Sequence, residues 1–195
     1  MKIEFENKNI DLETMDDLCR NLHALIYDFR MTLFLWEHIG ENADKVNKGG
    51  RGKTFWANLQ RVARDMMVLT ICKIYGDYLN IFKNRFLDIP EADKLFFGVN
   101  GLANSQDYKM LSDFRNRKVG HLKPEKPGGS SFWIPAAERL SVFLQTAERF
   151  LTDIRAFLAK AGDKHVCYSF ESDVSQFQVA TGYVFDQWLK SRNVA

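Results

Sequence analysis

The sequence predicts an all-α protein, an up-and-down helical bundle of about five main helices. Apolar residues recur every three to four positions along several long stretches, which is the period of an amphipathic helix. Segments rich in glycine and proline separate these stretches and mark helix ends. Of the 195 residues, 46% are apolar and 13% aromatic, enough for one sizeable core. We therefore expect a single helical domain over residues 1–195.

The N-terminal part predicts one long helix after a short irregular segment. Residues 1–10 precede the first periodic stretch, and we expect them to be loosely ordered. A helix is predicted from Leu12 to about Asn42. Its core face consists of Met15, Leu18, Leu22, Leu25, Phe29, Leu33 and Trp36. The glycine-rich stretch 47–52 follows as a basic loop, and its spacing departs from that of a phosphate-binding loop.

A second helix is predicted from about Thr54 to Tyr75. Its core face consists of Phe55, Leu59, Val62, Met66, Leu69 and Ile74. We interpret Trp56, Met66 and Met67 as core residues rather than as a cofactor site. Glycine and proline interrupt residues 76–104, and we expect one or two short helices there.

The last two main helices lie in the C-terminal third. Pro135 begins a helix that runs to about Lys160. Its core face consists of Leu140, Phe143, Ala147, Phe150, Leu151, Ile154 and Leu158. A final helix is predicted from about Ser172 to Lys190. Its apolar residues are Val174, Phe177, Val184, Phe185, Trp188 and Leu189.

The remaining main helix, residues 105–122, is the most informative for function. Asn104 or Ser105 is its predicted N-cap. Its apolar arc consists of Tyr108, Leu111, Phe114, Val119 and Leu122. Arg115 projects from within that arc, where a cation is unusual. His121 follows roughly 9 Å along the helix axis and 120° around it, a separation that a long guanidinium side chain can cover when both groups bind one phosphate.

The run Arg-Asn-Arg-Lys-Val-Gly-His at 115–121 resembles the signature of the HEPN superfamily, all-α nucleotide-binding proteins and ribonucleases. The helical stretch 55–77, the chain length and the motif's place before a long penultimate helix resemble the abortive-infection (AbiU-type) branch. The resemblance covers roughly residues 10–160. Glycine stands before His121, where alanine is commoner. The resemblance implies a HEPN-type bundle, a homodimer, and a role in prokaryotic phage defence or stress.

The resemblance also implies a metal-independent endoribonuclease, in which a ribose 2′-OH attacks the adjacent phosphate. Arg115 and His121 would be the catalytic pair, with His121 moving protons and Arg115 stabilising the added negative charge. Asn116 would contact the phosphate or support the pair. Either Asp65 or Asp77 would orient Arg115.

Positive charge is concentrated beside this motif, although the net charge of the chain is only +2. Residues 115–126 hold five cations against one carboxylate. Such local focusing is expected of a site for a polyanion. We therefore expect Arg117, Lys118 and Lys123 to bind the RNA backbone.

No metal or cofactor site is indicated. Cys19, Cys72 and Cys167 are widely spaced without a CxxC pair, so we expect packing roles for them. The histidines form no HExxH pattern. No run approaches the roughly 20 apolar residues of a membrane span, and the N-terminus does not resemble a signal peptide. We expect a cytoplasmic protein with no cofactor and no membrane partner.

Two other functions remain open. A non-catalytic nucleotide- or RNA-binding module, or one half of a toxin–antitoxin or other defence pair, would use the same basic patch without cleaving RNA. A purely structural helical protein would pair Arg115 with a carboxylate at a helix seam and use His121 as a C-terminal cap. RNA binding without cleavage products would support the first alternative. The second alternative predicts no salt-sensitive RNA binding.

Overall fold

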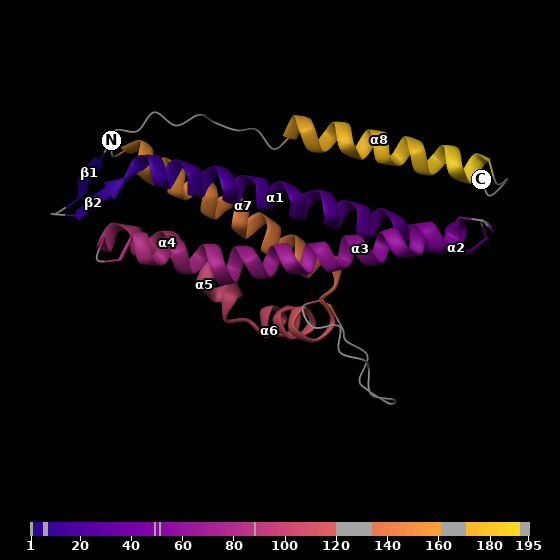
Figure 1. The fold of residues 1–195 in the computed structure, drawn as a ribbon, viewed down its shortest axis with the longest axis horizontal. Coiled ribbons are helices and arrows are strands. Elements are labelled where there is room, and N and C mark those ends of the chain that lie inside the picture. Colours follow the sequence, from indigo (N-terminus) through magenta and orange to yellow (C-terminus); the bar gives the residue numbers. More distant parts are fainter. Residues whose placement is uncertain are drawn as a thin grey trace. The chain divides into compact units, whose positions relative to one another are not determined.

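The computed structural model describes residues 2–5, 8–48, 50, 52–87, 89–119, 134–160 and 171–191. The regular secondary structure of this described part is helical except for one short N-terminal ribbon, which confirms the predicted all-α class (Figure 1). The α-helices are α1 (Leu12–Glu41), α2 (Ala43–Lys48), α3 (Lys53–Cys72), α4 (Leu79–Arg85), α5 (Phe97–Ala103), α6 (Gln106–Phe114), α7 (Ala137–Lys160) and α8 (Glu171–Lys190). The other helical segments are the π-helices η1 (Lys73–Tyr78) and η3 (Arg115–Val119) and the 3-10 helix η2 (Pro90–Phe96).

Two short strands, β1 (Lys2–Phe5) and β2 (Lys8–Asp11), pair antiparallel directly before α1. Ile3 lies opposite Ile10 in this ribbon. The sequence predicts loose order for residues 1–10, whereas in the structure the backbones of residues 2–5 and 8–11 form a ladder. Four residues per strand are too few for a clear period-two pattern, so the ribbon leaves little trace in the sequence.

The chain divides into two compact units. The first unit is Met1–Ile26 with Val68–Cys167, and the second is Tyr27–Met67 with Tyr168–Ala195. Helices α1 and α3 contribute residues to both units. The motif at 115–121 belongs to the first unit.

Helix α7 supplies much of the core of the first unit. Every residue of its predicted core face is buried. The Phe150 ring meets Phe82 of α4 and Phe96 of η2, with centroids 5.6 and 5.5 Å apart. Burying one such side chain is worth roughly 1.5–3 kcal/mol, so these contacts hold the segment between α3 and α6 against α7.

That segment is more regular than the sequence predicts. Helix α3 passes directly into η1, which continues as α4. Pro90 then begins η2 at a position where its missing N–H costs nothing, and η2 leads into α5. A π-turn adds a residue to the helical repeat and rotates the apolar face. This rotation, together with Gly76, hides the continuous helix from a period-based prediction.

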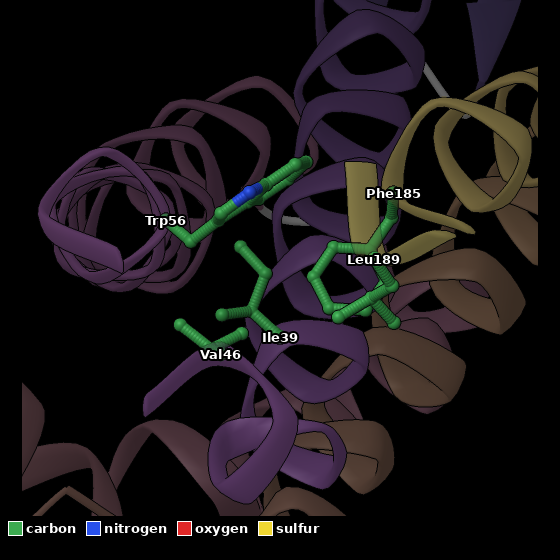
Figure 2. Close-up of a cluster of buried hydrophobic side chains, with 5 residues drawn as sticks. All are labelled: Ile39, Val46, Trp56, Phe185 and Leu189. Atoms are coloured by element: carbon green, nitrogen blue, oxygen red, sulfur yellow. The ribbon is translucent and has the colours of Figure 1, made fainter. Parts of the chain in front are cut away.

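The second unit is centred on Trp56. Figure 2 shows side chains from α1, α2, α3 and α8 pointing toward one another. The buried cluster consists of Ile39, Val46, Trp56, Phe185 and Leu189, and Leu35, Leu59 and Trp188 pack against it. The Trp56 and Phe185 rings are nearly perpendicular, with centroids 4.8 Å apart. Edge-to-face packing of this kind is favourable beyond the area it buries.

The glycine-rich stretch turns the chain into α3. Gly50 and Gly52 have φ of 62° and 108°, in the region that favours glycine. At Gly52 a Cβ atom would lie 2.7 Å from the indole nitrogen of Trp188. Both glycines therefore allow the backbone conformation of this turn, and Gly52 also leaves room for the Trp188 indole.

The predicted core face of α3 is wrong in part, whereas Trp56 and Met67 are buried, as interpreted from the sequence. The exposed residues there are Phe55, Val62 and Met66, and the buried ones are Trp56, Ala63 and Met67. Two adjacent apolar stripes run along this helix, and the stripe that carries the larger indole is the one that packs. Of the adjacent apolar residues of α8, Val184 is exposed and Phe185 is buried. Among the helices of the described ranges, none has the length and apolarity to cross a bilayer.

Candidate functional site

The predicted RNA-binding motif lies where α6 passes into η3. Arg115, Asn116 and Arg117 are within the described residues, together with the backbone of Lys118. The predicted site residues His121 and Lys123 lie outside them. The site can therefore be built outward from Arg115.

Helix α6 is anchored at its start and along its length. The Tyr108 backbone N–H donates to Ser105 Oγ at 3.1 Å, which makes Ser105 the N-cap, as predicted. Phe114, at the other end, is buried. Arg139 of α7 donates to both carboxylate oxygens of Asp107, at 3.0 and 3.3 Å. Together these contacts fix the helix that ends immediately before the motif.

Arg115 begins the π-helical segment η3. Its backbone N–H bonds to the carbonyls of both Leu111 and Ser112. Its side chain is half-buried, and its Nε donates to Asn116 Oδ1 at 3.1 Å. Asn116 thus contacts Arg115 directly. Segments of π-helix are rare in proteins, and those that occur are often found at functional sites.

Arg115 lies close enough to Cys72 of α3 and Tyr108 of α6 to lower the pKa values of both groups. Asp77 of η1 acts on the same two groups and raises their pKa values. Burial raises the pKa of the Cys72 thiol to about 11, while Arg115 lowers it and Asp77 raises it. Burial also raises the pKa of Tyr108, with Cys72 and Asp77 in the same sense and Arg115 opposing. The thiol and the phenol are therefore protonated and neutral near pH 7. Arg115 and Asp77 are opposite charges that act on the same two groups.

Tyr75 and Gly76 of η1 determine where Tyr108 lies. The Tyr75 hydroxyl donates to the Phe143 carbonyl at 2.6 Å, and burial raises the pKa of Tyr75. The Tyr75 and Tyr108 ring centroids are 6.2 Å apart. A Cβ atom at Gly76 would lie 2.9 Å from the Tyr108 hydroxyl oxygen. The π-helix η1 thus supports α6 through an aromatic contact and a glycine.

The two carboxylates predicted as partners of Arg115 have different surroundings. One oxygen of Asp65 accepts hydrogen bonds from Nε and Nη2 of Arg64, at 2.9 and 2.8 Å. Asp77 instead acts on the thiol and phenol that Arg115 also influences. Asp77 is therefore the better candidate to balance the charge of Arg115.

Cys72 and Tyr108 are site residues that the sequence marks only as packing residues. Tyr108 shares the predicted apolar arc with Phe114, and its distance of seven residues from Arg115 places both on one helix face. Cys72 carries no such signal, because only the fold brings the end of α3 to α6. Within the described ranges, no three or more histidine, cysteine or acidic residues could hold a metal ion.

No protein-family model, curated protein or solved structure matches the chain. Its chemistry must therefore be inferred from the side chains. Arg115 offers a guanidinium that can bind phosphate, and the Asn116 amide oxygen accepts a hydrogen bond from it. The Cys72 thiol and the Tyr108 hydroxyl nearby are neutral donors, because their pKa values are raised. Such a set suits the binding and stabilisation of an oxyanion.

Proposed function

We propose that this chain is a metal-independent endoribonuclease of HEPN type. The observation that carries the proposal is the placement of Arg115, half-buried at the start of η3 with its Nε tied to Asn116. A guanidinium held in this way presents its remaining N–H donors to a phosphate in a fixed direction. Fixed donors stabilise developing charge more effectively than donors that must first reorient.

In the proposed reaction, the ribose 2′ oxygen forms a bond to the adjacent phosphorus, and the bond from phosphorus to the 5′ oxygen breaks. One proton leaves the 2′-OH and one is delivered to the 5′ oxygen. His121 carries a proton in this exchange, and Arg115 offsets the added negative charge on the phosphorane. The products end in a 2′,3′-cyclic phosphate and a 5′-OH, and Arg117, Lys118 and Lys123 hold the RNA backbone.

RNA binding without cleavage is the second candidate, and one observation favours it. Cys72 and Tyr108 both keep their protons near pH 7, because their pKa values are raised. Neither can serve as a general base there, so the proton transfers depend on His121. A chain whose His121 does not reach the phosphate would bind RNA through the same cations and leave it intact.

We propose a homodimer whose paired motifs form one groove, with a partner protein of the antitoxin or defence type that restrains it in a prokaryotic stress response. Sedimentation equilibrium tests the homodimer directly. A mass equal to one chain at micromolar concentration would contradict it.

Cleavage of single-stranded RNA in excess EDTA tests the enzymatic proposal. We expect products with 2′,3′-cyclic phosphate ends, identified by mass spectrometry. Arg115→Ala should lower the rate on the order of 100-fold, because one fixed donor group is worth a few kcal/mol in the transition state. Arg85→Ala, an exposed cation in the last turn of α4, is the matched control and should cleave normally. Tight RNA binding with no product would favour the second candidate.

A further inference from the structure

A second surface of the first unit combines an exposed aromatic ring with two hollows. Phe97, the first residue of α5, is 85% exposed. A hollow of about 250 Å³ and a more open one of about 510 Å³ are both lined by Phe97 and Gly98. Together they reach the size of small-molecule sites, roughly 300–1,000 Å³. An aromatic side chain this exposed has little role in the core.

The smaller hollow is cationic. Lys94 of η2 and Arg149 of α7 line it, with Thr146 and Asp153. Arg149 Nε lies 3.8 Å from Asp153 Oδ2, and the arginine side chain is 85% exposed. An exposed ion pair at this distance contributes little to stability, so the guanidinium can reorient toward an anion at small cost. Two cations against one carboxylate suit a phosphate group.

The larger hollow presents side-chain amides. Asn100 and Asn104 line it, together with the carboxylate of Asp93. The Asn104 amide donates to the Asn100 backbone carbonyl at 2.9 Å. The side-chain oxygen of Asn100, in contrast, is buried and accepts no hydrogen bond. A buried acceptor without a donor is unfavourable, and an N–H group of a ligand, reached by a small rotation of the amide, would relieve it.

We propose that Phe97 is the stacking platform of a nucleotide-binding site. The phosphate would lie beside Lys94 and Arg149, and an amino group of the base would donate to Asn100. Stacking on an aromatic ring tolerates any base, because every base has a π-face. This chemistry is shared by a free nucleotide and by one unit of single-stranded RNA. In the second case, the surface holds part of the RNA that Arg115 acts on, and that version rests on the proposed function.

Fluorescence anisotropy with a labelled 2′-O-methyl oligoadenylate measures binding without cleavage, since the attacking hydroxyl is blocked. Phe97→Ala should weaken binding on the order of tenfold, the effect of losing one stacked base, and Phe97→Trp should retain it. Val142→Ala removes another exposed apolar side chain, on α7, and should leave binding unchanged.

The cations are tested in the same assay. Arg149→Ala should weaken binding and flatten its salt dependence, because it removes a phosphate contact. Asp153→Asn should tighten binding, because it removes the competing carboxylate. Arg85→Ala, outside both hollows, is the charge control and should behave as wild type.

Competition with AMP separates the two sources of nucleotide. Displacement of the oligomer by AMP supports a site for free nucleotides, and displacement only by longer RNA supports an RNA subsite. Unchanged affinity of Phe97→Ala, or no binding of either probe to the wild-type chain, overturns the inference. The cleavage assay is independent of this result: product that depends on Arg115, with normal binding by Phe97→Ala, would leave the proposed function intact and refute the Phe97 site alone.

Discussion

The hydroxyl oxygen of Tyr108 lies 2.9 Å from the point where a side chain on residue 76 would begin, and residue 76 is glycine. This close approach joins η1 to α6, the helix that ends just before Arg115. The placement of the candidate site therefore depends on a glycine that lies far from the motif in the sequence.

Gly76→Ala should displace Tyr108 and destabilise the first unit by about 1 kcal/mol, the usual scale for overpacking by one methyl group. Urea unfolding of the purified variant measures the loss. Adding Tyr108→Phe to this variant removes the clashing oxygen and should recover most of the loss. Gly182→Ala is the control, because no heavy atom lies within 4 Å of a Cβ atom built there. Full additivity of the two site substitutions would show that the contact does not couple them.

Trp56→Ala should cost about 3–5 kcal/mol, because it empties the centre of the buried cluster in Figure 2. Phe55→Ala, one residue earlier, should change stability by no more than about 0.5 kcal/mol, since Phe55 is 61% exposed. Thermal unfolding of both variants gives the comparison. A larger loss for Phe55→Ala would mean that the other stripe of α3 forms the core.

Gly52→Ala should destabilise the second unit by more than Gly50→Ala. Both residues have positive φ, so each substitution carries backbone strain of about 1–3 kcal/mol. Only Gly52 also has the Trp188 indole in the space that a Cβ atom needs. Chemical denaturation followed by tryptophan fluorescence reports both effects. Equal losses in the two variants would argue against the Trp188 contact.

Stability should fall as the pH rises from about 9 to about 11, in part because of Cys72. Its pKa is raised from 9.0 to about 11 in the folded chain, so the unfolded chain releases the thiol proton first. The stabilisation is fully present below the lower value and is lost as the pH approaches the upper one. Cys72→Ala should flatten this decline in the unfolding free energy, whatever its effect at neutral pH. Tyr75 and Tyr108 contribute to the decline in both proteins, and Cys72 also raises the pKa of Tyr108. The difference between the two profiles therefore reports Cys72 together with its effect on Tyr108. Parallel pH profiles would contradict the burial of the thiol.

The sequence predicts the long helices well where one face alone is apolar. In α7 most apolar residues fall on a single stripe, and every residue of the predicted core face is buried. In α3 two stripes compete, and periodicity cannot tell which will pack against the bulky residues of α1 and α8. The segment from η1 to α5 is harder to predict, because π- and 3-10-turns break the 3.6-residue period.

Some features of the candidate site could likewise be predicted from the sequence, and others could not. The motif, the Ser105 cap and the choice between Asp65 and Asp77 as partners of Arg115 could be framed from the sequence. The contribution of Cys72 could not, because it arises when η1 and α6 are brought together by the aromatic packing of Tyr75. Contacts between distant segments leave no pattern in a single sequence.

The most direct test of the proposed ribonuclease compares wild type with His121→Ala in the presence of EDTA. Cleavage of single-stranded RNA and binding of its 2′-O-methyl analogue are measured on the same preparations. We predict that wild type forms 2′,3′-cyclic phosphate ends and that His121→Ala loses cleavage by at least about 100-fold while keeping near-normal affinity, since the imidazole transfers protons and adds little to phosphate binding. Cleavage by His121→Ala at the wild-type rate, or wild-type cleavage that appears only when magnesium is added, would contradict the account.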